Sequence, residues 1–136
     1  MYSLGRLFNA RLSTTTAALT VDLSDCGGVT IFGTGTGSGD VTFTQRTGPD
    51  GTGSSAALTV DRWYGQTSGV WTETLLSPED DAFAMNVTLW AVEIDADQLS
   101  DNYRYVAASA AAGTLFLVKR DLHVQRKVSN LRDVRA

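Results

Sequence analysis

The stretch ALTVDLSDCGGVTIF, residues 18–32, contains the pattern that decides the fold of this chain. Residues 18–23 alternate apolar and polar side chains, as expected for a strand with one buried face. Asp25 and the two glycines after it favour a turn, because both residue types adopt turn conformations readily. Residues 29–32 predict the next strand. The stretch therefore predicts two short strands joined by a tight turn.

Similar short apolar-rich segments recur along the rest of the chain. Glycine-rich turns, such as residues 33–39 and 47–55, separate them. Pro78, within the acidic residues 77–81, predicts a loop because proline cannot continue a central strand. The further predicted strands are residues 40–46, 57–64, 70–75, 86–94, 103–108 and 114–118. Since no amphipathic helix longer than two turns is evident, these strands predict an all-β protein, an antiparallel β-sandwich of the jelly-roll type.

Length and composition narrow the functional classes. With 136 residues the chain has room for one domain. No apolar run approaches the roughly 20 residues that span a bilayer, and the first residues lack the continuous apolar stretch of a signal peptide. One cysteine, Cys26, and one histidine, His123, exclude a disulfide framework and disfavour zinc or histidine chemistry. We expect no membrane association, no enzymatic activity and a buried or half-buried thiol at Cys26.

The net charge of −4 is unevenly distributed. Residues 1–12 carry +2, residues 13–118 carry −10 and residues 119–136 carry +4 from their Asp, Glu, Lys and Arg side chains. An acidic body between two basic ends predicts contact with further copies of the chain or with another acidic surface. The alternative interpretation is a pair of charged tails surrounded by solvent.

We expect residues 1–17 and 121–136 to form extended arms on a sandwich of residues 18–120. Apolar side chains are spaced among the basic ones in both arms, which is not typical of solvated tails. Such arms often become ordered on a neighbouring subunit, where apolar groups are buried and arginines pair with carboxylates. Disordered termini are the alternative. The candidate interface residues are Arg6, Leu7, Phe8, Arg11, Arg120, Arg126, Lys127, Val128, Leu131, Arg132 and Arg135.

Motifs for catalysis or metal binding fail on specific residues. Asp40 follows the glycine-rich residues 33–39 where a phosphate-binding Walker loop needs lysine, and no helix comes next. A calcium loop that begins at Asp95 needs glycine at its sixth position and glutamate at its twelfth, but the chain has Ser100 and Val106 there. We therefore expect the aspartates of this segment to stabilise turns. Glu73 and Glu93 lie in predicted strands, but a rim position is favoured over a glycosidase pair. We therefore predict no catalytic residue, no metal site and no cofactor.

The aromatic residues raise a further alternative. Trp63 and Tyr64 point to opposite faces of one strand, so one of them leaves the core unless a loop or subunit covers it. Exposed rings of this kind stack on sugar rings in carbohydrate-binding sandwiches, and Trp71 is another candidate for this role. Most of the aromatic rings are nevertheless expected in the core. Nucleic acid is not an expected partner, because phosphates repel the acidic body and the basic ends contain few aromatics.

Several segments together resemble small structural proteins of tailed bacteriophages. They are residues 19–33 (LTVDLSDCGGVTIFG), 40–64 (DVTFTQRTGPDGTGSSAALTVDRWY), 90–110 (WAVEIDADQLSDNYRYVAASA) and 121–131 (DLHVQRKVSNL). In proteins of that kind the domain is a β-sandwich found in virions. The resemblance implies a non-enzymatic structural protein that is made in the host cytoplasm and placed in the virion, with the capsid surface favoured.

A head decoration or minor capsid protein is the leading hypothesis. Such a protein is expected to self-associate, with a homotrimer favoured, and to bind the major capsid protein. A tail or fibre-associated module is the alternative within the same class. From a different class, a carbohydrate-binding β-sandwich with a glycan ligand stays open.

Overall fold

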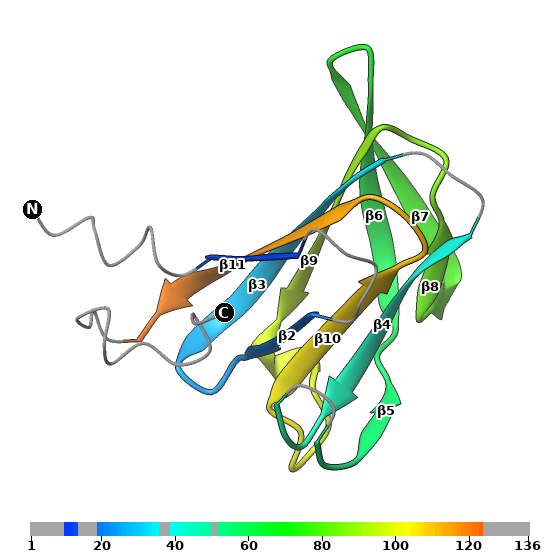
Figure 1. Ribbon diagram of the computed structural model, residues 1–136. Coiled ribbons are helices and arrows are strands. Elements are labelled where there is room, and N and C mark those ends of the chain that lie inside the picture. The colour runs from blue at the N-terminus through cyan, green and yellow to red at the C-terminus, as the bar shows by residue number, and fades with distance from the viewer. Residues whose placement is uncertain (1–9, 14–18, 36–38, 50–51, 124–136) are drawn as a thin grey trace, which may run out of the picture.

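The computed structural model describes residues 10–13, 19–35, 39–49 and 52–123 (Figure 1). In these ranges the chain forms strands and one short 3-10 helix, and it contains no α-helix. The elements are β1 (Ala10–Ser13), β2 (Leu19–Asp22), β3 (Cys26–Thr34), β4 (Asp40–Arg46), β5 (Ser55–Ala57), β6 (Val60–Thr67), β7 (Val70–Asp80), β8 (Ala82–Ala84), β9 (Leu89–Asp95), η1 (Ala96–Gln98), β10 (Tyr105–Ala110) and β11 (Thr114–Leu122).

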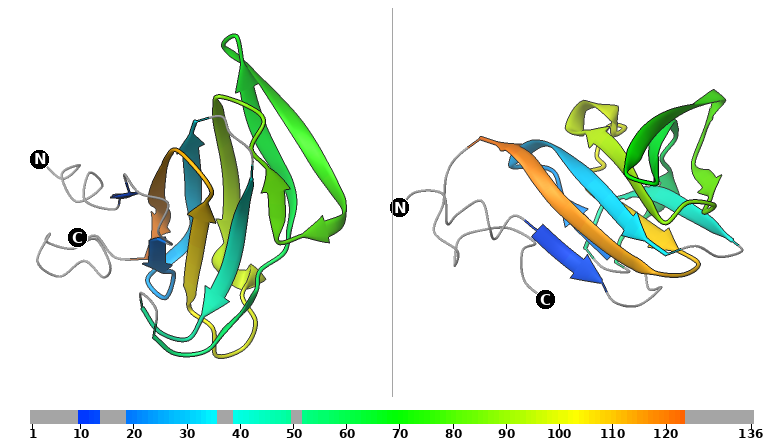
Figure 2. Two further views of the ribbon diagram at one scale, coloured as in Figure 1. Left: turned by 45° about the vertical axis from the view of Figure 1, so that its right-hand side comes forward. Right: turned by 90° about the horizontal axis from the view of Figure 1, so that it is seen from above.

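The strands form two antiparallel sheets that pack against each other (Figure 2). One sheet has six strands in the order β1-β11-β3-β9-β6-β7. The other has the order β2-β10-β4-β5, and β8 also pairs with β4. The structure therefore confirms the all-β sandwich predicted from the sequence.

Alternating side chains from both sheets fill the space between them. In β9, Trp90, Val92 and Ile94 are fully buried, whereas Glu93 and Asp95 are exposed. Such alternation is the signature of a strand with one face on the core, because successive side chains point to opposite faces. The sequence pattern thus fixes which face of β9 is buried.

Aromatic rings form the centre of this core. Phe83 stacks on Trp63 with ring centroids 4.6 Å apart and meets Trp90 edge-on at 5.3 Å. Each such pair contributes about 0.5–1.5 kcal/mol beyond the burial of its surface. Trp63 is buried and Tyr64 is half-buried on the opposite face of β6, so the prediction that one of them leaves the core is confirmed.

The prediction of a loop at residues 77–81 is wrong. β7 continues through Pro78 to Asp80, and the Ser77–Pro78 peptide bond is cis. β7 is the edge strand of its sheet, and an edge strand tolerates proline because one side of it needs no ladder partner. The pairing with β6 is also irregular here, since the register shifts between Val60 and Arg62.

Both ends of the expected sandwich extend further than the sequence predicted. Residues 10–13, placed in the N-terminal arm, form β1 and pair with β11. β11 itself continues to Leu122, beyond the expected boundary at residue 120. A four-residue strand is too short to display a period, so the sequence pattern does not predict β1.

Candidate functional site

The outer face of the six-stranded sheet carries the exposed aromatic side chains. The register places Phe116, Phe32, Ala91 and Tyr64 side by side on β11, β3, β9 and β6. The ring centroids of Phe32 and Phe116 are 6.5 Å apart. Trp71 of β7 lies in the adjoining row and is 44% exposed. An apolar row therefore crosses the sheet on its outer face, which none of the described strands covers.

A shallow groove of about 340 Å³ opens along this row, and we call it the outer groove. It is lined by Thr30, Phe32, Tyr64, Trp71, Ala91 and Glu93. Aromatic faces beside a carboxylate can hold an apolar or amphipathic group and orient it through one polar contact. The outer groove therefore has the chemistry that suits an amphipathic group.

A second, more polar hollow of about 420 Å³ continues the outer groove toward η1, and we call it the acidic pocket. It is lined by Thr59, Asp61, Arg62, Tyr64, Glu79, Glu93, Asp95 and Gln98. Tyr64 and Glu93 line both hollows, so the two form one continuous surface across β9, β6 and β7.

Carboxylates outnumber cations in the acidic pocket. Arg62 pairs with Asp61 at 2.9 Å and with Glu73, just outside the pocket, at 3.5 Å. The hydrogen bond that Arg62 donates lowers the pKa of Asp61 below its ordinary value. Glu79 accepts a hydrogen bond from the Thr59 hydroxyl at 3.1 Å. Within the described ranges, neither Glu79 nor Glu93 has an ion pair, so both remain available to an external cation.

Arg120 is the candidate interface residue whose surroundings the structure defines. It lies on β11 and reaches across β3 to bind Asp95 of β9, and it also pairs with Asp121 at 3.3 Å. The hydrogen bond to Asp95 raises the pKa of the Arg120 guanidinium. Arg120 therefore already bridges three strands within one chain and neutralises one carboxylate of the acidic pocket.

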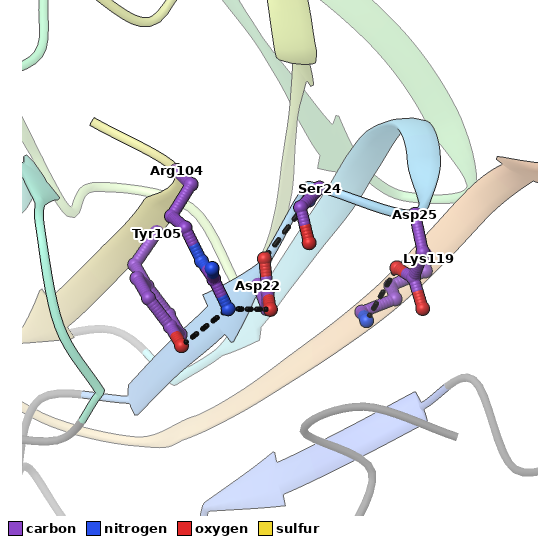
Figure 3. A network of polar contacts seen from close by, with 6 residues as sticks. All are labelled: Asp22, Ser24, Asp25, Arg104, Tyr105 and Lys119. Carbon is purple, nitrogen blue, oxygen red and sulfur yellow. Dashed lines mark hydrogen bonds and ion pairs between the residues drawn. The ribbon is translucent and has the colours of Figure 1, made fainter. Parts of the chain in front are cut away.

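A separate polar network ties the turn between β2 and β3 to β10 (Figure 3). Arg104 donates hydrogen bonds to Asp22 at 2.9 Å and to the Tyr105 hydroxyl at 3.1 Å. The backbone N–H of Ser24 donates to the other Asp22 oxygen at 2.9 Å. The Asp22 carboxylate is buried, and these donors replace the hydrogen bonds to water that it loses there.

The same turn carries a buried ion pair, which Figure 3 shows, and the thiol of Cys26 follows it. Lys119 of β11 donates to Asp25 at 3.0 Å, and both side chains are almost fully buried. Cys26, the next residue, is buried as expected, and desolvation raises its pKa to about 11. The thiol therefore stays protonated at neutral pH. Asp25, Lys119 and Cys26 are thus better explained as residues that stabilise the fold than as a nucleophilic site.

Most of the predicted interface residues lie outside the described residues. Arg11 is in β1, opposite Leu117 of β11, and Arg120 is described above. Those beyond the described ranges are Arg6, Leu7, Phe8, Arg126, Lys127, Val128, Leu131, Arg132 and Arg135. Their role as an assembly surface stays a prediction.

The sequence did not single out the half-buried Phe32 and the exposed Phe116 as rings on the outer face. Both follow another apolar residue, Ile31 and Leu115, and adjacent strand residues point to opposite faces. The presence of two adjacent apolar residues in one strand could therefore have indicated an outward-facing ring here, as it did for Trp63 and Tyr64. Which member of such a pair faces the core depends on the partner sheet, so the sequence alone leaves it open.

The aspartates near residue 95 lie at turns: Asp95 precedes η1, Asp97 lies within it and Asp101 lies in the turn that follows. The backbone N–H of Asp95 donates to the Gln98 side chain at 2.7 Å at the start of η1. Across the part of the chain that the structure describes, no group of three or more His, Cys, Asp or Glu side chains is arranged to hold a metal ion. Those residues also contain no helix long and apolar enough to cross a membrane.

Comparison with known proteins adds no relative: no protein-family model, no curated protein and no solved structure matches this chain.

Proposed function

We propose that this chain is a non-enzymatic structural protein of a virion, a capsid decoration or minor head protein that self-associates, with a homotrimer favoured, and binds the major capsid protein. The observation that carries this proposal is the solvent-exposed apolar surface on the outer face of the six-stranded sheet. On this face Trp71 and Leu75 of β7 are 44% and 63% exposed and Phe116 of β11 is 39% exposed, and Trp71 lines the outer groove. Contiguous apolar surface rimmed by charged residues is typical of protein interaction sites.

The strand pairing supports a jelly-roll form of the sandwich. β1 pairs with β11, β2 with β10, β3 with β9 and β4 with β8. Such nested pairing arises when a long two-stranded ribbon is rolled into two sheets, so that the chain changes sheet at each step from β1 to β4 and from β8 to β11. β5, β6 and β7 are then an insertion between β4 and β8. Jelly rolls are frequent in viral capsid domains, which agrees with the proposed role.

Locating the protein in a particle tests this proposal. An antibody against the folded chain is applied to purified virions of the virus that encodes it and viewed by electron microscopy. Regular labelling of the capsid shell is the expected result. Labelling restricted to the tail supports the tail module instead. A chain missing from purified particles contradicts a virion role of either kind.

Carbohydrate binding is the second candidate function, because the outer groove places Tyr64 and Trp71 beside Glu93. Aromatic faces that stack on sugar rings, with a nearby carboxylate to accept hydroxyl hydrogen bonds, suit a glycan ligand. A glycan array probed with the wild-type chain, Tyr64→Ala and Trp71→Ala tests it. Binding that both substitutions remove favours this function, and an array without signal contradicts it.

A further inference from the structure

The acidic pocket and the outer groove together form one surface that combines carboxylates with aromatic rings. The pocket contains the carboxylates of Asp61, Glu79, Glu93 and Asp95 against the guanidinium of Arg62. The adjoining groove presents the aromatic rings to solvent. A ligand for this surface therefore needs several cations interspersed with apolar groups.

The C-terminal segment of the chain has that composition. Residues 124–136, VQRKVSNLRDVRA, carry four basic side chains against one aspartate. Their apolar residues are Val124, Val128, Leu131 and Val134, placed among the basic ones. Arginines can pair with Glu79 and Glu93 while the apolar side chains pack on Tyr64 and Trp71.

The position of the segment favours a second copy as its source. The described chain leaves the sheet at the end of β11, whereas the unpaired carboxylates lie on β9 and β7, toward the opposite edge. Figure 1 shows the end of β11 and the β6–β7 hairpin on opposite sides of the molecule. Arg120 of the same chain already binds the nearest pocket carboxylate, Asp95. The strand that leads into the segment and the strands that carry the unpaired carboxylates are therefore different parts of one sheet.

We propose that residues 124–136 of one copy bind the acidic pocket and outer groove of a second copy. The inference rests on the self-association in the proposed function and names its contact. Because donor and receptor surfaces differ, the contact is head-to-tail, and a rotation that closes produces a ring. A ring of three copies is the homotrimer favoured above.

Charge exchange in the full-length chain tests this contact. One variant reverses the pocket (Glu79→Lys with Glu93→Lys), and the other reverses the segment (Arg126→Glu with Lys127→Glu). Sedimentation velocity measures association of each variant alone and of an equimolar mixture. We expect each variant alone to associate at least roughly tenfold more weakly than wild type, because like charges then face each other. The mixture should regain part of the association, since a pocket-reversed copy and a segment-reversed copy complement each other, while a ring of three keeps one contact between two copies of the same variant.

A matched control changes the same number of charges outside the pocket. Asp97→Lys with Asp101→Lys alters exposed carboxylates around η1 and should associate as wild type does. Thermal unfolding of every variant shows whether the fold is retained.

Three results would overturn the inference. One is a pocket-reversed variant that associates as strongly as wild type. This result would not affect the proposed virion role, because the particle labelling tests that role separately. Another is a mixture that fails to regain association. The last is a monomeric wild-type chain at all concentrations, in which case the segment does not bind a second copy.

Discussion

At the scale of single residues, the packing around Trp90 leaves no room for a side chain at the neighbouring position 33. Trp90 is fully buried, and Gly33 lies opposite it on the neighbouring strand β3. A β-carbon placed on Gly33 would lie 2.0 Å from the indole ring. Position 33 must therefore be glycine, because the ring occupies the space that any side chain would need.

Gly33→Ala is accordingly expected to lower the free energy of unfolding by about 1–3 kcal/mol, the usual cost of overpacking a well-packed core. Urea unfolding followed by tryptophan fluorescence measures the change. Val70→Ala is the control, since that side chain is 64% exposed and its loss should change stability by no more than about 0.5 kcal/mol. A Gly33→Ala protein as stable as wild type would show that Trp90 can move aside.

The buried thiol makes stability depend on pH in the alkaline range. The pKa of Cys26 is about 11 in the folded chain against an ordinary value of 9.0, chiefly because of desolvation. Between these values the unfolded chain loses the proton that the folded chain keeps. The contribution of this group is therefore fully present below pH 9 and is lost as pH rises toward 11.

Cys26→Ala isolates this contribution from other groups that titrate in the same range. Between pH 8 and pH 10, the free energy of unfolding of wild type should fall by about 1 kcal/mol more than that of Cys26→Ala. Urea titrations at both pH values measure the difference. Parallel pH profiles would mean that the thiol is as well solvated in the folded chain as in the unfolded one.

At the scale of elements, the Lys119–Asp25 pair fastens the turn between β2 and β3 to β11. Both groups are buried, so removing one leaves the other charge without a close counter-ion in a low-dielectric site. Lys119→Met should lower the free energy of unfolding by about 3 kcal/mol, and the double variant Lys119→Met with Asp25→Asn should lose less than the sum of its single changes.

Arg62→Met provides the matched control for this pair. It removes the same charge from an exposed ion pair with Asp61, and exposed pairs contribute little. Denaturant unfolding of these variants measures the coupling between Lys119 and Asp25. Additive losses in the double variant would show that the two side chains do not interact.

The longer elements could be predicted from the sequence, and the short ones could not. Each predicted strand is present, because alternation in segments such as β4 and β9 reports one buried face. β5 and β8 have three residues each, fewer than a period-two pattern needs to be recognised. The extension of β7 through Pro78 depends on its edge position, which only the sheet order reveals.

The candidate site was predictable only in part for a related reason. The sequence indicated that either Trp63 or Tyr64 leaves the core, and Tyr64 does. It gave no indication that Tyr64, Trp71 and Glu93 line one surface, because they lie on three strands that pairing brings together. Cross-strand register carries that information, and local pattern does not.

At the scale of the whole molecule, the charge division predicts how self-association responds to salt. Residues 13–118 carry −10 and residues 119–136 carry +4, so the proposed contact between copies would bring opposite charges together. Raising sodium chloride from roughly 0.05 to 0.5 M shortens the screening length to a few ångströms and should weaken association. Sedimentation velocity across this range measures the effect. Association that strengthens with salt would assign the contact to apolar burial instead.

The hairpin of β6 and β7 projects beyond the other strands (Figure 1). Its tip is a two-residue turn with positive φ at Ser68 (51°) and Gly69 (79°), and a β-carbon on Gly69 would have no atom within 4 Å. A short peptide inserted between these two residues would therefore project into solvent without disturbing the sandwich. A chain that coats a particle would then present one copy of that peptide per subunit, which makes this tip a natural position for displaying epitopes in a repeated array.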